Sequence, residues 1–259
     1  MLDAKMRKPA PIDFWDKVWN RSDIHIVNVD HVTIEAATDP QEKLFYSLLG
    51  DITGKIILEL GCGNGDLAIY MAKLGNHVVA IDYSKESIKN TIANAILNEV
   101  DHLVSAYQLD ARCLSDLNHK YDFIVGKFIL HHIEPFDQFA QILSRILKKG
   151  GHGIFIENNS RNPFLILCRK FLVGRFGIPK GGDKEEYPFE PREINILEKY
   201  FKVTLYYPEF KFFIMIGPYL LNNNQNMTKL LKKMDSIVFN LLPIFHKYSY
   251  VQIVDFEKP

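Results

Sequence analysis

The stretch Lys55–Leu74, KIILELGCGNGDLAIYMAKL, constrains the fold of this chain more than any other. Four apolar residues surround one acid, Glu59, and run directly into three alternating glycines, a pattern typical of a buried parallel strand that enters a tight turn. Glycine is required where the backbone adopts a positive φ or lies against a ligand. Apolar residues then recur at helical spacing, so the turn opens a helix (Leu67, Ala68, Met71, Ala72 and Leu74). A strand, a glycine turn and a helix N-terminus together predict a nucleotide-type binding site.

Small departures from the dinucleotide fingerprint G-x-G-x-x-G favour a different ligand. The glycines are Gly61, Gly63 and Gly65, and Asp66 occupies the last glycine position of that fingerprint. One acid, Glu59, precedes the loop and a second, Asp82, ends the next strand. Carboxylates beside the turn would repel a pyrophosphate. They suit a ligand that carries an ammonium, a sulfonium and a ribose.

These residues resemble motif I, E-x-G-x-G-x-G, of the class I S-adenosylmethionine-dependent methyltransferases, especially the small-molecule members of that family. The resemblance covers roughly residues 54–201 and implies S-adenosyl-L-methionine as cofactor, with S-adenosyl-L-homocysteine as product. It implies that Asp82 binds the ribose, that Tyr83 lies against the adenine and that Asp110 accepts from the adenine amino group. The full set of implied cofactor contacts is Glu59, Gly61, Cys62, Gly63, Asn64, Gly65, Asp82, Tyr83, Asp110, Ala111 and Lys127.

Alternation of strands and helices predicts an α/β fold with a right-handed parallel sheet. After the first strand, further strands are expected at 76–82, 103–109 and 151–157, and the stretch 121–133 is expected to be another strand with its exit. Two later apolar stretches, 202–210 and 248–256, fit the family's Rossmann-like, doubly wound sheet of seven strands, mostly parallel with an antiparallel last strand. Ligands of such sheets lie at the carboxyl ends of the strands.

The domain organisation is expected to be a helical N-terminal lid, residues 1–50, followed by a methyltransferase domain, residues 51–259. Substrate-lid insertions are expected at about 158–189 and 211–247. Near the start, Phe14, Trp15, Val18 and Trp19 share one helical face, which either packs on the domain or covers the ligands. We therefore include Trp15 among the candidate substrate contacts.

Composition limits the classes of function. The chain of 259 residues has zero formal net charge, which argues against a general nucleic-acid binder. Its three cysteines are far apart and show neither zinc-ligand spacing nor a disulfide framework. No apolar run suits a signal peptide or approaches the ~20 residues of a membrane span. The expected location is the cytoplasm.

Candidate catalytic residues follow the fourth predicted strand. A sulfonium methyl is already electrophilic, so the protein must chiefly align the nucleophile and exclude water. An alcohol nucleophile also needs help to lose its proton, whereas an amine can arrive deprotonated. His131 and His132 have the most useful intrinsic pKa, about 6.5, although each could instead be a packing or cofactor-contacting residue. No metal is expected.

The acceptor is indicated more weakly. Residues 158–182 contain five basic side chains and no acid, which fits a solvated loop face, recognition of an anionic group or attraction to a membrane surface. This segment resembles the substrate lid of methyltransferases from natural-product and surface-glycan pathways. The candidate substrate contacts here are Glu157, Asn158, Arg161 and Arg169.

A second apolar region lies between the last two predicted strands. Residues 230–242 form an apolar helix face that either packs over the sheet or substrate pocket, or makes a dimer contact or a lipid-facing surface. The oligomeric state, monomer or homodimer, stays open.

The function predicted from these patterns is methyl transfer from S-adenosylmethionine to an oxygen or nitrogen of a small, possibly anionic molecule in natural-product or glycan biosynthesis. Alternatives are a protein or nucleic-acid methyltransferase, disfavoured by the neutral charge and by the lack of an N/D-P-P-Y motif, and a non-catalytic cofactor-binding subunit. A dehydrogenase is a remoter alternative.

Overall fold

A computed structural model describes residues 11–20, 24–29, 39–116, 119–171, 187–214 and 225–259. The first half of the described chain runs through α1 (Ile12–Trp19), α3 (Pro40–Leu49), β1 (Ile56–Leu60), α4 (Asp66–Lys73), β2 (His77–Asp82), α5 (Lys85–Leu97), β3 (Val104–Gln108), η1 (Ala111–Asp116) and β4 (Tyr121–Lys127). The second half contains η2 (Leu130–His132), α6 (Phe136–Ile146), β5 (Leu147–Asn158), α7 (Pro163–Phe171), α8 (Pro191–Leu197), β6 (Lys202–Tyr206), α10 (Gln225–Leu241), η4 (Pro243–Tyr248) and β7 (Val251–Glu257).

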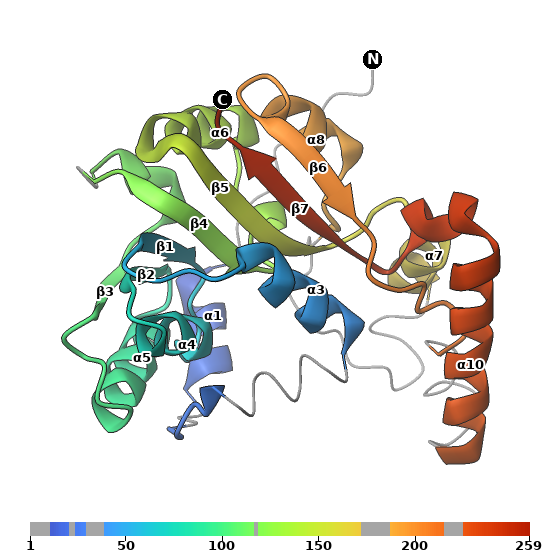
Figure 1. Ribbon diagram of the computed structural model, residues 1–259, viewed down its shortest axis with the longest axis horizontal. Helices are drawn as coiled ribbons and strands as arrows, with labels where there is room; N and C mark the ends of the chain where they lie inside the picture. The colour runs from blue at the N-terminus through green and yellow to red at the C-terminus, as the bar shows by residue number, and fades with distance from the viewer. Residues whose placement is uncertain (1–10, 21–23, 30–38, 117–118, 172–186, 215–224) are drawn as a thin grey trace.

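The seven strands form one twisted sheet in the order β3-β2-β1-β4-β5-β7-β6 (Figure 1). Strands β1 to β5 are parallel to one another, whereas β7 runs antiparallel to both of its neighbours, β5 and β6. The order reverses direction at β1, because the chain passes from β1 to β2 on one side and later returns to β4 on the other. The predicted Rossmann-like sheet is confirmed.

Local sequence signals account for most element boundaries. Ser84 caps α5 by accepting a hydrogen bond from the Ser87 amide, and Gly50 ends α3 with a φ of 67°. Some boundaries differ from the prediction: β6 ends at Tyr206 rather than at residue 210, and β5 begins at Leu147 rather than at Gly151. The register of β5 against β4 shifts between Tyr121 and Phe123, so the strand continues through Gly150 and Gly151 as an irregularity.

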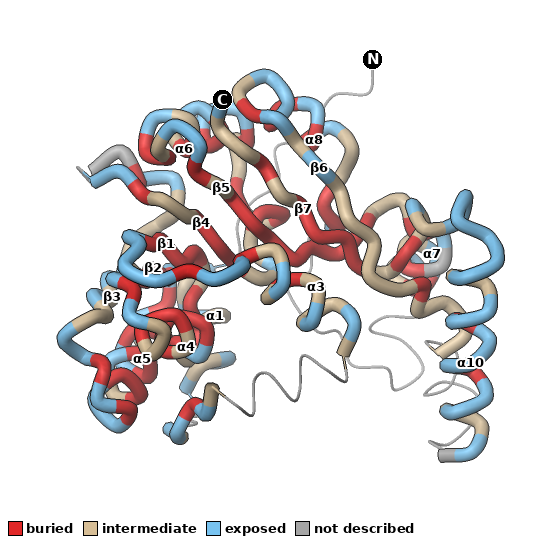
Figure 2. The backbone as a smooth tube through the Cα atoms, viewed as in Figure 1, coloured by how far each residue is buried: buried red, intermediate tan, exposed pale blue. Residues whose placement is uncertain are grey.

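Apolar side chains fill both faces of the sheet (Figure 2). Helices α3, α4 and α5 pack on one face around Phe45, Met71 and Ile57, and helices α6 and α8 pack on the other around Phe139 and Phe155. The central strands are covered on both sides, as expected for parallel strands. The carboxyl ends of β1, β2, β4 and β5 consequently converge on one edge between the two helical layers.

Within the described ranges, no helix is both long enough and apolar enough to cross a membrane.

Candidate active site

The glycine loop after β1 has the strained backbone that the sequence predicts. Gly61, Gly63 and Gly65 have φ values of 68°, 54° and 84°. At Gly63 an added Cβ would lie 2.6 Å from the ring of Trp19, and at Gly65 it would lie 2.7 Å from Thr91. Gly63 therefore allows an aromatic ring to lie on the loop, while Gly65, the N-cap of α4, allows close packing of α5.

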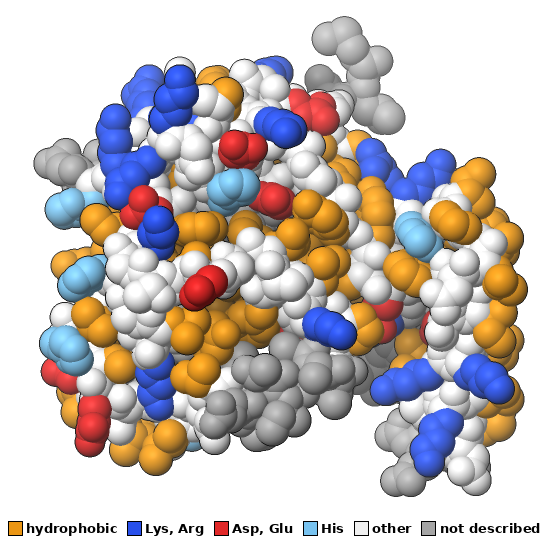
Figure 3. Space-filling model, viewed as in Figure 1, with side chains coloured by type: hydrophobic (Ala, Val, Ile, Leu, Met, Phe, Trp, Pro, Cys, Tyr) orange, Lys and Arg blue, Asp and Glu red, His pale blue; other side chains and the backbone are white. Residues whose placement is uncertain are grey.

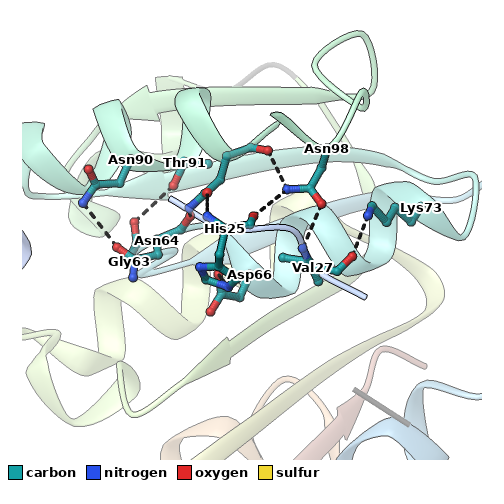
Figure 4. Close-up of polar contacts among 10 residues, drawn as sticks. His25, Val27, Gly63, Asn64, Asp66, Lys73, Asn90, Thr91 and Asn98 are labelled. Carbon is teal, nitrogen blue, oxygen red and sulfur yellow. Dashed lines mark hydrogen bonds and ion pairs between the residues drawn. The ribbon is translucent and has the colours of Figure 1, made fainter. Parts of the chain in front are cut away.

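Polar side chains of α5 hold this loop in place (Figure 4). Ser87 Oγ donates to the carbonyl of Gly63 at 2.7 Å, and Thr91 Oγ1 donates to the same carbonyl at 3.1 Å. Asn94 Nδ2 donates to the carbonyl of Asn64 at 3.0 Å. The loop carbonyls thus point toward α5, and the shape of the loop is fixed before any ligand binds.

The same face of α5 also fixes the N-terminal segment (Figure 4). Asn94 Oδ1 accepts from the His25 amide, and Asn98 Oδ1 accepts from the Val27 amide, both at 2.8 Å. Asn90 Nδ2 donates to the carbonyl of Trp19 at 2.9 Å. These bonds place α1 over the glycine loop, where the predicted lid helix was expected; the rest of the predicted lid includes residues outside the described ranges.

A cavity of about 800 Å³ opens at this edge of the sheet. Fifteen of the eighteen predicted site residues line it, namely Trp15, Glu59, Gly61, Cys62, Gly63, Asn64, Asp82, Tyr83, Asp110, Ala111, Lys127, His131, His132, Asn158 and Arg169. Gly65, Glu157 and Arg161 are not among the lining residues. Other lining residues were not predicted, among them Trp19, Tyr46, Arg112, Phe128 and Tyr250.

Two buried carboxyl groups mark the end of the cavity beneath the loop. Asp82 accepts hydrogen bonds from the amides of Gly63 (3.0 Å) and Ser84 (2.8 Å), and burial raises its pKa. Glu59 is also buried, and its Oε2 has no hydrogen-bond partner among the described residues. Burial raises the pKa of Glu59 to about 8, against the opposing charge of Lys127. A buried carboxyl oxygen without a partner in a cavity wall is suited to a cationic ligand group.

Two further lining residues, Tyr83 and Asp110, have the features expected of an adenine site. Tyr83 follows β2 and is 38% exposed, and Asp110 follows β3. Asp110 is already engaged by Arg112, which donates to it from the backbone and from the guanidinium at 2.9 Å. Burial raises the pKa of Asp110, but the hydrogen bonds and charge of Arg112 outweigh burial and hold it below the usual value. The Asp110 carboxylate, which is predicted to contact the adenine, therefore already binds Arg112.

The centre of the cavity wall holds a buried histidine–carboxylate pair. His131 Nδ1 lies 2.5 Å from Glu157 Oε2, and both side chains are buried. Glu157 Oε1 also accepts from the amides of Ile129 (2.9 Å) and Leu130 (2.6 Å). Glu157 therefore points into the protein, and its position corrects the expectation that it contacts substrate directly. A carboxylate can only accept, so Nδ1 carries the proton of this hydrogen bond, and in the neutral imidazole the lone pair is then on Nε2.

The remaining predicted catalytic and cofactor residues have aromatic surroundings. The ring of His132 lies 4.0 Å from that of His131 and 5.2 Å, edge-on, from that of Trp15 on α1. Lys127 Nζ lies 2.6 Å from Glu42 Oε2 on α3 and 5.2 Å from the centre of the Tyr46 ring. Burial raises the pKa of the Tyr46 phenol. Helices α1 and α3 thus both contribute walls to the cavity.

The predicted basic lid is only partly described. Arg169 on α7 lines the cavity, whereas Arg161 Nη1 donates to Tyr207 Oη at 3.1 Å and is not among the lining residues. Arg175 and Lys180 lie outside the described residues.

Some lining residues carried a sequence signal and others did not. Trp19 lies one turn from Trp15 on the helical face that the sequence analysis assigned to the lid, but only Trp15 was carried into the candidate substrate contacts. Arg112 follows Asp110 closely and could have been predicted as its partner. Tyr250 comes from the loop before β7, almost two hundred residues from the glycine loop, and only the folded sheet brings it to the site.

Comparison with known proteins agrees with this architecture. A family described as a methyltransferase domain matches residues 57–151. A ubiquinone biosynthesis O-methyltransferase of Alkalilimnicola ehrlichii is 32% identical over 152 residues, covering 57% of this chain and 60% of that protein. The corresponding protein of Aeromonas salmonicida is 26% identical, over 70% of this chain and 72% of its own length.

Among solved structures, the N-methyltransferase NodS of Bradyrhizobium japonicum in complex with S-adenosyl-L-homocysteine has the same fold. Its TM-score is 0.54 at 14% identity, covering 89% of this chain and 97% of NodS. The sheet order and the glycine loop define a Rossmann-like methyltransferase fold. Residues 57–151 thus match a methyltransferase domain, and the fold around them is that of the S-adenosylmethionine-dependent methyltransferases.

The residues of the cavity fit the cofactor of this family. Oε2 of Glu59, which has no hydrogen-bond partner among the described residues, suits the ammonium of the methionine moiety, and Gly63 lies in the wall beside it. Asp82 accepts one amide hydrogen bond on each oxygen, which leaves acceptor capacity for the ribose hydroxyls. Tyr83 and Asp110 line the end of the cavity suited to the adenine.

Proposed function

We propose that this protein transfers the methyl group of S-adenosylmethionine to a hydroxyl oxygen of a small molecule. The observation that carries the proposal is the buried His131–Glu157 pair in the wall of the cofactor cavity. Methyl transfer to an amine can proceed without a base, whereas an alcohol or phenol gains from a positioned one. A buried base with a fixed tautomer therefore favours an oxygen acceptor over a nitrogen acceptor.

The roles of the residues follow from their contacts. When bound, S-adenosylmethionine supplies the electrophilic methyl group. Glu157 fixes the ring of His131 through Nδ1, so that Nε2 is the atom that takes the proton from the acceptor hydroxyl. Trp15 and Trp19 on α1 cover the cavity and exclude water. His131 is then the catalytic base and Glu157 is a positioning residue.

The relatives support an oxygen acceptor, because both curated proteins compared above are named O-methyltransferases. Arg169 in the cavity wall supports an acceptor that carries an anionic group, as the basic segment after β5 suggested. We retain natural-product or glycan biosynthesis as the proposed context. A protein or nucleic-acid acceptor is less favoured, because the formal net charge is zero and the sequence lacks an N/D-P-P-Y motif.

The test combines cofactor binding with methyl transfer. We expect S-adenosylmethionine to bind in calorimetry and its labelled methyl group to appear on a small hydroxylated metabolite in a fractionated cell extract. His131→Ala should lower the transfer rate roughly 10²–10⁴-fold while cofactor affinity is retained. Glu157→Gln should lower the rate less and should shift the low-pH limb of the rate profile, because it perturbs the imidazole without removing it.

The control is His132→Ala, which removes the neighbouring imidazole but leaves the His131–Glu157 pair. If His131→Ala and His132→Ala both retain the wild-type rate at saturating acceptor, the base mechanism is wrong and an amine acceptor is favoured. If no metabolite gains label although the cofactor binds, the protein is a binding subunit.

A further inference from the structure

Helix α10 and the turn η4 expose a run of large apolar side chains, which we call the α10–η4 surface. Leu241 and Ile244 are the most exposed, each at 71%. Figure 3 shows hydrophobic side chains gathered along the outer edge of α10, at the right of the view. The exposed apolar members of the surface are Leu230, Met234, Ile237, Leu241, Leu242, Ile244 and Phe245.

This surface faces outward because the opposite side of α10 is firmly attached. Asp235 is buried and accepts hydrogen bonds from the amides of Phe212 and Phe213 at 2.8 Å and of Ile214 at 2.9 Å. Leu231 is buried on the same side. The spacing 230, 234, 237 and 241 places the exposed residues on another stripe of the helix. In the described part of the chain, α10 contacts residues 212–214 and η4 and none of its residues lines the cavity, which differs from the sequence-based expectation that it packs over the sheet or the pocket.

The charges beside the apolar stripe are all positive. Lys229, Lys232, Lys233 and Lys247 are exposed, and Asp235 is the one acidic residue of the segment 225–250, all of which is described. A second copy of this surface would place lysines against lysines, which disfavours self-association. The charge selects an anionic partner.

We infer that the α10–η4 surface docks the protein on an anionic lipid surface. Basic residues beside exposed Leu, Ile and Phe on one amphipathic helix are suited to the interface of a membrane with anionic headgroups. Helix α10 stands out as a ridge rather than lining a hollow (Figures 1 and 3), so it matches a deformable lipid surface better than a partner helix, which needs a groove.

The surface is joined to the rim of the cavity. Asn159, directly after β5, donates from Nδ2 to the carbonyls of Lys247 (3.0 Å) and Ser249 (2.9 Å). Asn162, at the start of α7, donates to the carbonyl of Tyr248 at 2.9 Å. Helix α7 carries Arg169 into the cavity wall. Docking through α10 and η4 would therefore hold the acceptor side of the cavity close to the lipid.

The test is co-sedimentation of the full chain with vesicles. We expect binding to vesicles of phosphatidylcholine with about one quarter phosphatidylglycerol, little binding to phosphatidylcholine alone, and weaker binding as salt is raised. The double substitution Leu241→Ser/Ile244→Ser should reduce the bound fraction at least about tenfold, because it removes the apolar contribution. Lys229→Gln/Lys232→Gln/Lys233→Gln should abolish the preference for the anionic vesicles.

The matched control is the substitution Ile96→Ser. Ile96 is 60% exposed and belongs to α5, which lies at the other end of the molecule from α10, so this variant should bind vesicles as the wild type does. Thermal unfolding checks that each variant is folded. Failure of the folded wild type to bind anionic vesicles would overturn the proposal. An equal loss of vesicle binding in Ile96→Ser would also overturn it. So would a wild-type dimer that the double substitution Leu241→Ser/Ile244→Ser dissociates, because the surface would then join two copies of the chain.

Discussion

Gly63 and Gly54 have similar backbone angles, so substitutions at these two positions can distinguish the effect of lost ligand contact from the effect of backbone strain. Gly63 and Gly54 have φ values of 54° and 69°, but an added Cβ meets Trp19 at Gly63 and nothing within 4 Å at Gly54. Alanine at either position should cost about 1 kcal/mol of stability, because a side chain disfavours positive φ. Only Gly63→Ala should also weaken S-adenosylmethionine binding, by about tenfold or more, in calorimetry. Equal affinities in the two variants would show that the loop does not contact the cofactor.

The buried carboxyl of Glu59 predicts a dependence of stability on pH. Its pKa is raised from 4.5 to about 8, so the folded protein retains a proton that the unfolded chain releases. This contribution favours folding fully below about pH 4.5 and is lost as the pH rises through about 8. Glu59→Gln, which is never charged, should therefore gain stability relative to the wild type, by up to a few kcal/mol, between about pH 5 and about pH 8. Urea unfolding of both proteins across this range measures the difference, and a constant difference would contradict the assigned cause.

Residues predicted for the site reach the cavity where they lie at or near the end of a strand. Glu59, Asp82 and Asp110 are placed in this way on strands that the alternating pattern predicts, and all three line the cavity. Glu157 also lies near a strand end, but sequence cannot show on which side of the strand its side chain points. The structure turns it inward to His131, a contact between residues 26 positions apart.

At the scale of elements, α5 connects the N-terminal segment to the glycine loop. Asn98→Ala removes the acceptor of the Val27 amide and the donors to the carbonyls of His25 and Asn94. Because one hydrogen bond contributes about 1 kcal/mol, this change should raise the rate of amide hydrogen exchange in residues 24–29. It should also weaken cofactor binding several-fold, because α1 would be held less firmly against the cavity.

Ile92→Ala, on the exposed side of α5, is the control for that experiment and should change neither quantity. If Asn98→Ala raises exchange in residues 24–29 but leaves cofactor affinity at the wild-type value, the N-terminal segment does not contribute to the site.

The sequence predicted the elements themselves well, because capping residues and hydrophobic periodicity are local. Ser84 and Gly50 marked helix ends that the structure confirms. The start of β5 was mispredicted because Gly150 and Gly151 are typical turn residues, and the pairing with β4 and β7 outweighs that local preference. The exposed stripe of α10 could not be predicted either, since periodicity shows an apolar face but not whether anything covers it.

At the scale of the whole molecule, the cavity joins helices α1, α3, α4 and α7 to the edge of the sheet. A ligand bound there should stabilise the fold as a unit, by about 2.7 kcal/mol at a free concentration of about 100 times Kd. We expect S-adenosylhomocysteine to raise the unfolding temperature accordingly and NAD to leave it unchanged. A shift with NAD alone would favour a dehydrogenase and would contradict the assignment of the cofactor site.

The position of β7 determines when this molecule can fold during synthesis. Although β7 is the last strand of the chain, it lies inside the sheet and pairs with β5 on one side and β6 on the other. Until residue 257 has left the ribosome, β5 has an open edge and β6 has no neighbouring strand to join. Every shorter nascent chain therefore presents an unpaired strand edge that another chain could occupy, and completion of the sheet closes it.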